Sequence, residues 1–551
     1  MHMDSTPSGG LRRVNKATIK ARLTTTSAWA LPKEESRIAP DDVYTNKDMD
    51  PSPPEMRLWT AWTFFAYWCS DLINPGTFAG SAGQVVALGL TWWEACLANI
   101  LGQFLVAIVI TANGIIGAKL HTPFAVSARS VYGYWGSKFP VFSRMVIACF
   151  WLSINSWTGG VYVTLMIQAI WPQYARLKNS IPVSEGATSR DFLSFFLFWA
   201  MQLPFIMIHP SKLAWVFNVK AVAVPCVALA TMIWCLVEAR PNVSQALNHQ
   251  ANRAAPGSAR FQAFIYAVTS TQGTWATLAL NIGDFSRYCK RPNSAYVQLF
   301  ALPVISGLLS IIGAISAACT LAIYNEDLYQ PYDITGKWGV SHGGRAAMFI
   351  ATSNSISAAN DLATLVPKYV NIRRGQLIVI TIGVFGFAPW KVTASASNLL
   401  SFMSSYSIVL APMGVLLATD FFIVKRQKVN IYQLYQPKGI YRFSKGWNWR
   451  AFVALACGIG PNMPGMVNAI NANINIGNIH YLYLVSNISS NLFAMSVYLA
   501  LNKFFPAHAA IIDVAVHDVL TPEDGMVHDT AFTGVEGKEK MDENVSVQPV
   551  L

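Results

Sequence analysis

Charged residues are scarce in this sequence. They make up 12% of its 551 residues, about half of the roughly 25% that soluble proteins carry. Hydrophobic residues make up 53%, which excludes an ordinary soluble domain and indicates long apolar runs. The net charge is +12, but the basic residues form short clusters between those runs. Such clusters are typical of membrane loops, so no nucleic acid partner is predicted.

Catalytic and metal-binding patterns are missing as well. The eight cysteines stand singly, with no CxxC pair, so neither a zinc site nor a disulfide framework is indicated, and we predict no metal site. No His and Asp are paired within an apolar run, and His121 and His209 fall in predicted loops. This argues against a membrane-embedded enzyme such as an acyl or glycosyl transferase. No ring of repeated filter residues indicates a channel.

The apolar runs predict an all-α membrane protein with about twelve transmembrane helices, because about 20 apolar residues cross a bilayer. We divide the chain into an N-terminal tail (1–57), a transmembrane transporter domain (58–502) and a C-terminal tail (503–551). The expected spans, none of which contains Lys or Arg, are 58–80, 92–117, 145–171, 192–208, 221–237, 264–282, 299–324, 346–366, 377–390, 399–424, 451–470 and 482–502.

Lysine and arginine set the predicted orientation. With an even number of spans both tails share one side, and most of the 40 Lys and Arg residues fall on that side. The positive-inside rule therefore predicts that both termini are cytoplasmic. Asn242 then lies in an outward loop as a glycosylation candidate, whereas Asn544 lies in the cytoplasmic tail. Lys538 and Lys540, in the same tail, are either plain solvated residues or targets of the ubiquitination machinery.

Two spans contain helix breakers. The first span includes the run 71–77, with Asn74, Pro75 and Gly76, and the sixth includes the run 272–275. Backbone groups freed by a break must be satisfied by protein, ions or substrate. Breaks in spans one and six are the pattern of a five-plus-five inverted repeat whose broken helices flank a substrate site. Glycine and proline are also simply common in membrane helices.

Two tryptophans and two asparagines fall deep within the predicted spans. Trp151 and Trp275 either sandwich a flat ring by stacking or pack in the core. Asn155 follows Trp151 by one helical turn and shares its face, and Asn354 lies in the eighth span. An amide offers a donor and an acceptor to the edge of a pyrimidine or purine, or it joins helices.

Two carboxylates also fall within spans. Asp71 and Asp361 are candidates to carry a coupling proton, because ionisable residues at membrane depth are costly and burial raises the pKa of a carboxyl group. The alternative role is to cap the end of a broken helix.

Several stretches together resemble the nucleobase-cation-symport-1 family, in its fungal branch of uracil, allantoin and uridine permeases, which also includes thiamine and nicotinamide riboside transporters. The matching stretches run almost from end to end in the expected order. They are 46–51, 65–71, 281–288, 354–361, 367–375, 406–412 and 420–426.

The resemblance implies a LeuT-like core of ten helices in two inverted repeats plus two C-terminal helices. It implies that the substrate lies between helices 1, 3, 6, 8 and 10. Trp151 and Trp275 match the tryptophans that hold the ring, and Asn155 and Asn354 match the amides that read its edge. Tyr406 lies in the stretch of helix 10 that supplies gating and selectivity.

Three departures from the family pattern stand out. Asn155 replaces the usual glutamine, and Gly283 replaces the usual proline. The segment ahead of Asn354 is shorter than in relatives, and it places 348–350 (Met, Phe, Ile) where hydroxyls or amides are expected. Apolar side chains do not ligate a hard cation, so we expect proton coupling rather than sodium coupling, and no cofactor.

We therefore predict a secondary active transporter, not an enzyme, that imports a nucleobase or related heterocycle such as uracil, allantoin or uridine across the plasma membrane. Thiamine and nicotinamide riboside remain open as substrates. A nutrient receptor that binds without transport also remains open.

Overall fold

Helices make up most of the described chain. The computed structural model describes residues 36, 38–39, 49–207, 214–240, 242–247, 257–339, 341–356, 381, 386–471 and 473–516. Within these residues strand-like pairing is restricted to isolated bridges such as the one between Trp59 and Cys289. The expected all-α architecture is confirmed.

The helices follow one another along the chain with short connections. The first half contains α2 (Ala61–Leu72), α3 (Pro75–Leu88), α4 (Trp92–Leu120), α5 (Phe124–Ser127), α6 (Arg129–Tyr132), α7 (Lys138–Ile170), α8 (Ser189–Met207), α9 (Ala214–Glu238), α11 (Ser258–Thr274), α12 (Ala276–Asn281) and α13 (Gly283–Ser286). The second half contains α14 (Gln298–Tyr324), α15 (Pro331–Gly336), α16 (His342–Ile356), α18 (Pro389–Val392), α19 (Ala396–Thr419), α20 (Ile431–Leu434), α21 (Trp449–Ile459), α22 (Met463–Ile470), α23 (His480–Leu484) and α24 (Ser486–Phe504).

Several of the described helices are long and apolar enough to cross a bilayer unaided. They are Trp92–Leu120, Lys138–Ile170, Pro292–Tyr324 and Ala396–Val424. The pair Gly477–Leu484 and Ser486–Phe504 qualifies together but bends by 87°. The first and sixth predicted spans are each split into shorter helices, α2 with α3 and α11 with α12, at the expected breaks.

The outer faces of these helices are apolar. On α4, Leu97, Leu101, Phe104 and Ile108 are all exposed, at the spacing of one helical stripe. The opposite face of α4 buries Asn99 and Gln103, among other residues. A helix that turns its apolar side chains outward and its amides inward suits lipid surroundings rather than water.

Some helix ends differ from the sequence-based expectation. Helix α3 continues to Leu88, past the expected end at 80, and stops where Gly89 takes a left-handed conformation with φ 66°. Helix α7 begins at Lys138 rather than at 145, because Pro140 falls in its first turn, where proline is tolerated. Arg144, which the sequence analysis leaves outside the third span, therefore lies within α7.

Two other expected spans are only partly covered by the described residues. The eighth, 346–366, is described as far as Ile356 within α16. The ninth, 377–390, falls mostly outside the described residues, and its described end leads into the short helix α18. The two inverted repeats and the exact number of spans remain predictions.

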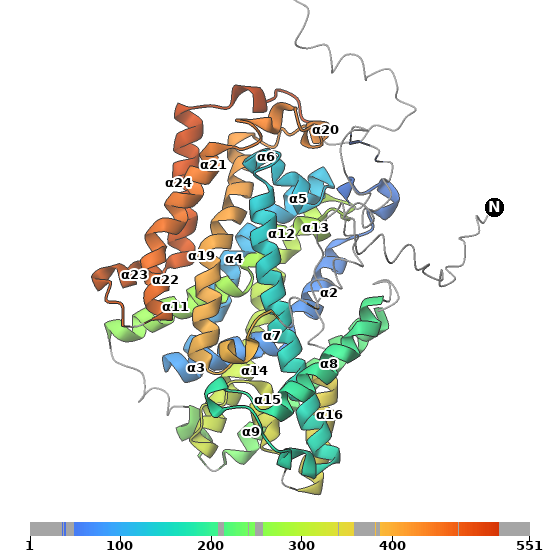
Figure 1. Cartoon of the computed structure of the whole chain (residues 1–551), viewed down its shortest axis with the longest axis vertical. Helices are drawn as coiled ribbons and strands as arrows, with labels where there is room; N and C mark the ends of the chain where they lie inside the picture. Colours follow the sequence, from blue (N-terminus) through green and yellow to red (C-terminus); the bar gives the residue numbers. More distant parts are fainter. Residues whose placement is uncertain are drawn as a thin grey trace, which may run out of the picture.

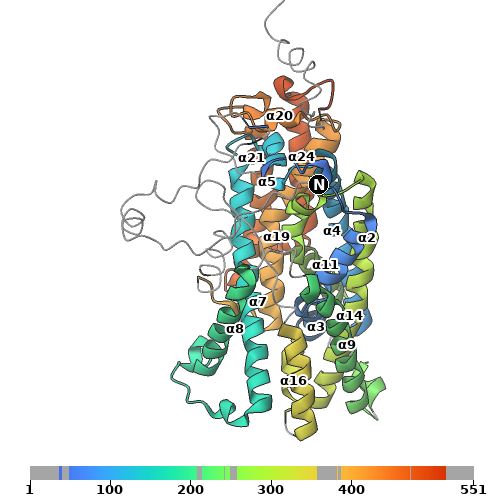
Figure 2. The same cartoon turned by 90° about the vertical axis from the view of Figure 1, so that its right-hand side faces the viewer.

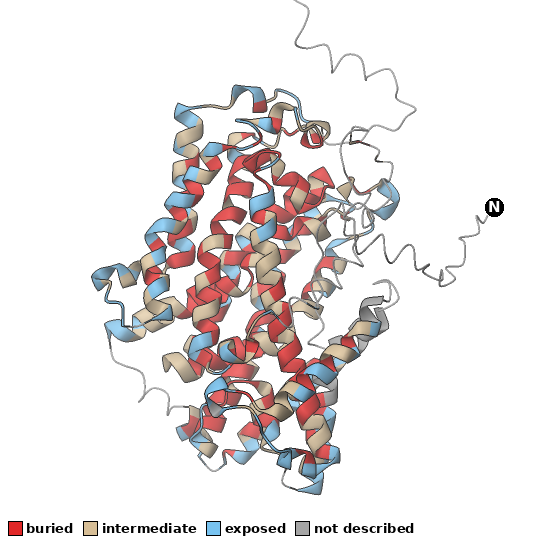
Figure 3. Ribbon diagram, in the orientation of Figure 1, coloured by how far each residue is buried: buried red, intermediate tan, exposed pale blue. Residues whose placement is uncertain are grey.

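Figures 1 and 2 show how the helices are arranged. Helices α7 and α19 run along the long axis of the molecule, with α5, α6 and α20 at one end and α9, α15 and α16 at the other. Helix α14 packs against α4 and α3, and α7 packs against α8 and α16. Helices α21 and α24 pack against each other and against α19. Figure 3 shows that buried residues are concentrated on the helices in the middle.

The end of α19 continues as one turn of π-helix, Asp420–Val424, and is anchored by a buried ion pair. Lys425 Nζ donates to Asp420 Oδ2 at 2.5 Å and to the Ser130 carbonyl at 2.7 Å. The Tyr498 hydroxyl donates to Asp420 Oδ1 at 2.8 Å. Both charged side chains are at most 3% exposed. This network fixes α19 to α6 and α24 at one end of the molecule.

Candidate functional site

A cavity of about 200 Å³ lies where the two helix breaks meet α7. Asn74 and Pro75 from the first break and Trp275 from the second all line it, together with side chains of α7 and α19. Both interruptions of the polypeptide therefore line the same cavity.

The first break is stabilised by its own side chains. Asn74 caps α3: its Oδ1 accepts the Thr77 amide at 2.9 Å, and its Nδ2 donates to the Asp71 carbonyl at 2.5 Å. Pro75 follows at the first helical position, where its missing N–H costs no hydrogen bond. Because both polar atoms of Asn74 bond to nearby backbone, this residue shapes the break.

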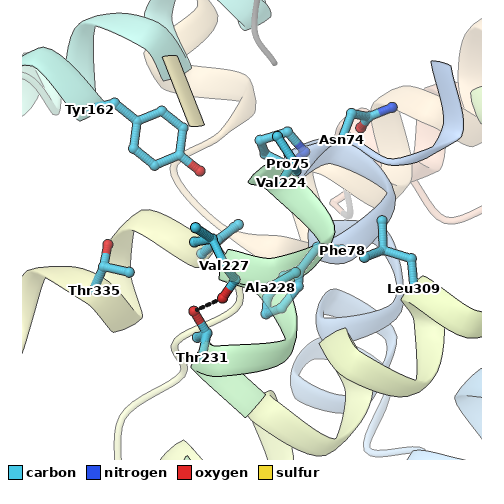
Figure 4. Close-up of a pocket in the computed structure, with 11 residues that line it drawn as sticks. Asn74, Pro75, Phe78, Tyr162, Val224, Val227, Ala228, Thr231, Leu309 and Thr335 are labelled. Carbon is cyan, nitrogen blue, oxygen red and sulfur yellow. Dashed lines mark hydrogen bonds between the residues drawn. The ribbon is translucent and has the colours of Figure 1, made fainter. Parts of the chain in front are cut away.

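A second, smaller pocket lies behind the same break. It has a volume of about 30 Å³, which is enough for a water molecule, and it shares Asn74 and Pro75 with the large cavity. Figure 4 shows the hydroxyl group of Tyr162 pointing toward this pocket, which is also lined by Val227 of α9. The two residues of the break thus form a wall between two hollows.

The second break brings α11 against α19. A Cβ atom on Gly273 would lie 2.2 Å from the Met403 carbonyl oxygen, so only glycine fits this contact. Trp275 follows with φ −107° and ψ 7°, outside the helix. Its indole packs edge to face on Trp68 at 5.7 Å and is 6% exposed. Its Nε1 is buried with no hydrogen-bond partner among the described residues.

Trp151 lines the cavity from α7 and is held from behind by Tyr406. The Trp151 Nε1 donates to the Tyr406 hydroxyl at 3.2 Å, and that hydroxyl donates to the Gly273 carbonyl at 2.6 Å. The Trp151 ring also packs against Phe402 at 6.2 Å. The indole is thereby fixed in orientation, with Tyr406 behind it rather than among the residues that line the cavity.

The structure brings together most of the predicted site residues. Trp151, Asn155, Trp275 and Asp71 line the same cavity, and Asp71 Oδ2 accepts the Tyr67 hydroxyl at 3.5 Å.

The structure does not place the side chains of two other predicted residues, Asn354 and Asp361. Asn354 belongs to α16, but its side chain lies outside the described residues, and Asp361 lies outside them altogether. The roles predicted for all these residues, in binding substrate or carrying a proton, remain predictions.

Several polar residues of the cavity wall were missed from the sequence, among them Arg144, Asn281 and Gln330. Arg144 was assigned to a loop because arginine usually marks the end of a span. Asn281 had a signal, since it begins the matching stretch 281–288. Gln330 comes from the connection before α15, and nothing in the local sequence places it at the cavity. Among the described residues no group of His, Cys, Asp and Glu is arranged to hold a metal ion.

Comparison with known proteins identifies the family. Residues 51–488 match the family of permeases for cytosine and purines, uracil, thiamine and allantoin. The chain belongs to this family. Its members are permeases, which are transporters rather than enzymes.

Two curated relatives come from Saccharomyces cerevisiae. The allantoin permease is 30% identical over 489 residues, covering 84% of this chain and 76% of its own. The uridine permease is 31% identical over 494 residues, covering 86% of this chain and 77% of its own.

A solved structure shares the fold of this permease. Mhp1, a nucleobase-cation-symport-1 family transporter in a closed conformation with bromovinylhydantoin bound, aligns with a TM-score of 0.63 and 18% identity. The alignment covers 84% of this chain and 97% of Mhp1. The expected nucleobase-cation-symport-1 resemblance and the LeuT-like transporter fold are therefore confirmed.

Proposed function

We propose that this permease is a proton-coupled importer of a nucleobase or a related small heterocycle, such as uracil, allantoin or uridine, in the plasma membrane. The observation that carries this proposal is one cavity that is lined by both helix breaks and by two indoles, Trp151 on α7 and Trp275 at the second break. Two aromatic residues at one cavity suit a flat ring.

The size of the cavity suits a small substrate. Pockets for drug-sized ligands have volumes of roughly 300–1,000 Å³, whereas this cavity measures about 200 Å³. One small ring with a short substituent fits this space.

The polar groups of the cavity suit the edge of such a ring. Asn155 presents a donor and an acceptor one turn beyond Trp151. Because Tyr406 fixes the Trp151 indole, little conformational freedom of that ring remains to be lost when substrate binds.

Proton coupling is proposed in place of sodium coupling. In α16, Met348 is buried and Ile350 is exposed, and neither offers a ligand to a hard cation. The nearby Thr352 hydroxyl donates to the Met348 carbonyl of its own helix at 2.7 Å. Asp71 lines the cavity. Of the two candidates for the proton carrier, it is the one that lies among the described residues. We propose no cofactor.

The remaining partners follow from the membrane setting. The lipid bilayer surrounds the apolar outer faces, and both termini are proposed to be cytoplasmic by the positive-inside rule. The ubiquitination machinery is the proposed partner of Lys538 and Lys540, which lie outside the described residues.

The test is uptake of labelled uracil, allantoin and uridine by transporter-deficient yeast expressing the permease at pH 5 and pH 8. We expect faster uptake of at least one compound at pH 5, and its loss in Trp151→Ala. Trp62→Ala is the matched control, because Trp62 is 74% exposed on the outer face of α2, and it should transport normally. Equal uptake at both pH values would contradict proton coupling. Binding without net uptake would identify a receptor instead.

A further inference from the structure

A tight hairpin lies just before α21. The backbones of Ser444 and Trp447 exchange two hydrogen bonds of 3.1 Å. The two residues between them, Lys445 and Gly446, have φ angles of 55° and 97°. Two positive φ angles in succession are typical of a type I′ turn, and this left-handed conformation is uncommon for lysine. The turn places Lys445 at an exposed tip.

The hairpin is docked on the start of α7. The Gly446 carbonyl accepts the Trp135 amide at 2.9 Å and the Gly136 amide at 3.0 Å. The Trp135 ring leaves no room for a Cβ atom on Gly446, and the Lys138 ammonium group lies 4.4 Å from the centre of the same ring. Because Trp135, Lys138 and Lys445 are all exposed, two exposed lysines are attached close to one exposed indole.

No acidic residue offsets these charges locally. Residues 129–145 and 421–512 contain no Asp or Glu. Arg442, whose carbonyl accepts the Gly446 amide at 2.7 Å, adds a third exposed cation beside the turn. Among the described residues, neither Lys138 nor Lys445 pairs with a carboxylate. A surface with several cations and no carboxylate attracts an anion.

Exposed apolar side chains continue from this basic surface along two helices. Phe139 and Phe142 are exposed on α7, and Trp447 and Val453 are exposed at the start of α21. Phe452 joins the two groups, because its ring lies 5.9 Å from that of Phe139 and 5.1 Å from that of Trp447. Helix α7 is long and apolar enough to cross a bilayer, and exposed tryptophans mark the ends of such helices. The surface is therefore charged at one end and apolar at the other, at the boundary of the membrane.

We propose that this surface binds one class of lipid, an anionic phospholipid of the cytoplasmic leaflet. Its headgroup oxygens accept hydrogen bonds from Lys138 and Lys445, and its acyl chains lie along Phe139 and Phe142. The apolar helix faces alone would accept any lipid, whereas two lysines beside an indole select the lipid by its charge.

The position of the site agrees with this occupant. Helix α21 contacts α6, and Figure 1 shows both helices toward the end of the molecule where α20 lies. The positive-inside rule assigns the loops at this end to the cytoplasm, and anionic lipids are concentrated in the cytoplasmic leaflet. None of the residues that form the site lines the transport cavity, so this proposal does not depend on the proposed substrate.

Lipid selectivity tests the proposal on the purified full-length permease. Native mass spectrometry measures how much phosphatidylserine and phosphatidylcholine remain bound when both are supplied at equal concentration with the same acyl chains. We expect the wild type to prefer phosphatidylserine at least about fivefold, which is the contribution of a single lysine near an anionic surface. In the double variant Lys138→Gln/Lys445→Gln this preference should fall below about twofold, because both cations are removed.

Matched variants separate recognition of charge from folding. Arg176→Gln/Lys178→Gln removes two exposed charges beyond the other end of α7 and should keep the full preference. Lys138→Arg/Lys445→Arg keeps both charges and should keep the preference too. Because both lysines are exposed, Lys138→Gln/Lys445→Gln should melt in detergent like the wild type. If it does not, an intermediate preference in Lys138→Gln alone decides the question.

Three results would overturn the proposal. Equal retention of the two lipids by the wild type would show that no charge-selective lipid site exists. The full preference in Lys138→Gln/Lys445→Gln would place the selective contacts elsewhere on the permease. Displacement of bound phosphatidylserine by an equal concentration of inorganic phosphate would make this surface a site for a free anion rather than for a lipid. Substrate uptake enters none of these measurements, so the proposed function is tested separately.

Discussion

The Trp151 indole N–H donates to the Tyr406 hydroxyl, and that hydroxyl donates in turn to the Gly273 carbonyl. One phenol therefore joins α7, α19 and the end of α11. The aromatic surface offered to a substrate depends on the relative position of three helices that are far apart in the sequence.

Removing that phenol oxygen should weaken binding more than it disturbs the fold. Tyr406→Phe leaves the Trp151 Nε1 without its acceptor and the Gly273 carbonyl without its donor. Each buried group left unpaired costs about 1–3 kcal/mol. Part of this cost is relieved when the Trp151 indole leaves its wild-type orientation. We expect the KM for uptake to rise roughly three- to tenfold. Tyr296→Phe, at a 53% exposed tyrosine, is the control, and a similar KM in both variants would refute this role of Tyr406.

The buried ion pair at the end of α19 should be needed for stability. Lys425→Met leaves the Asp420 carboxylate buried without its cation, and breaking a buried pair costs about 3–5 kcal/mol. A lower melting temperature in detergent is expected, with partial recovery in the double variant Lys425→Met/Asp420→Leu. Lys503→Met changes an exposed lysine and should melt like the wild type. A double variant less stable than Lys425→Met would contradict this explanation.

Two glycines at helix ends should respond to alanine in opposite directions. At Gly273 the added Cβ would lie 2.2 Å from the Met403 carbonyl oxygen, whereas at Gly283 its nearest neighbour, the Phe124 nitrogen, is 3.7 Å away. Gly273→Ala should lose about 1–3 kcal/mol through overpacking. Gly283→Ala should gain about 0.4–1 kcal/mol, since it restricts the unfolded chain at a position with an ordinary φ. Thermal melting of both variants measures the difference, and a stabilised Gly273→Ala would be incompatible with the contact.

The stability of the permease should depend on Asp333, which lies in α15 outside the spans. Burial raises the pKa of the Asp333 carboxyl from 3.8 to about 6. A hydrogen bond from the Gln330 backbone N–H and the charge of Lys337 oppose this rise, and the charge of Glu326 adds to it. Because the folded state holds this proton to a higher pH than the unfolded state, the free energy of unfolding falls as the pH rises from about 4 to about 6, by up to about 3 kcal/mol.

The asparagine variant tests this dependence. Asp333→Asn should remove that part of the pH dependence and be more stable than the wild type at pH 7. Melting curves between pH 4 and pH 7 compare it with Glu55→Gln, at an exposed carboxylate, which should keep the wild-type slope. If the pH dependence of stability in Asp333→Asn equals that of the wild type, other titratable groups cause it.

Glycosylation tests the proposed orientation in the membrane. Asn242 is exposed just beyond α9 and is followed by Val-Ser, so an outward loop here would carry a glycan in a eukaryotic secretory pathway. A mobility shift that disappears in Asn242→Gln but persists in Asn544→Gln is expected. A glycan on Asn544 would reverse the orientation.

The helix breaks were predictable because their causes are local. Asn74 caps the following helix with its own side chain, and Pro75 occupies the position where its missing N–H is harmless. Near Trp275 the sequence signals the break through Gly273, although the reason for that glycine, a carbonyl of α19, appears only in the fold. Local chemistry of this kind needs no knowledge of distant helices.

The composition of the cavity wall was less predictable. Trp151 and Asn155 share a face by helical geometry, so their common cavity followed from spacing alone. Arg144 lies on the same helix, but the sequence places it in a loop, because a charged residue usually marks the end of a span. A nearby carboxylate such as Asp284 stabilises an arginine within a helix, and this contact appears only in the fold. Tyr406 was predicted from its place in helix 10, whereas its hydrogen-bond partners belong to α7 and α11 and could not be read from helix 10 itself.

Asn74 and Pro75 separate the large cavity from the pocket shown in Figure 4. A displacement of this short segment toward either hollow enlarges the other, so the two volumes vary in opposite directions. A molecule that occupies the larger space therefore resists movement of the segment in one direction only. Solvent that enters the smaller space resists the reverse movement.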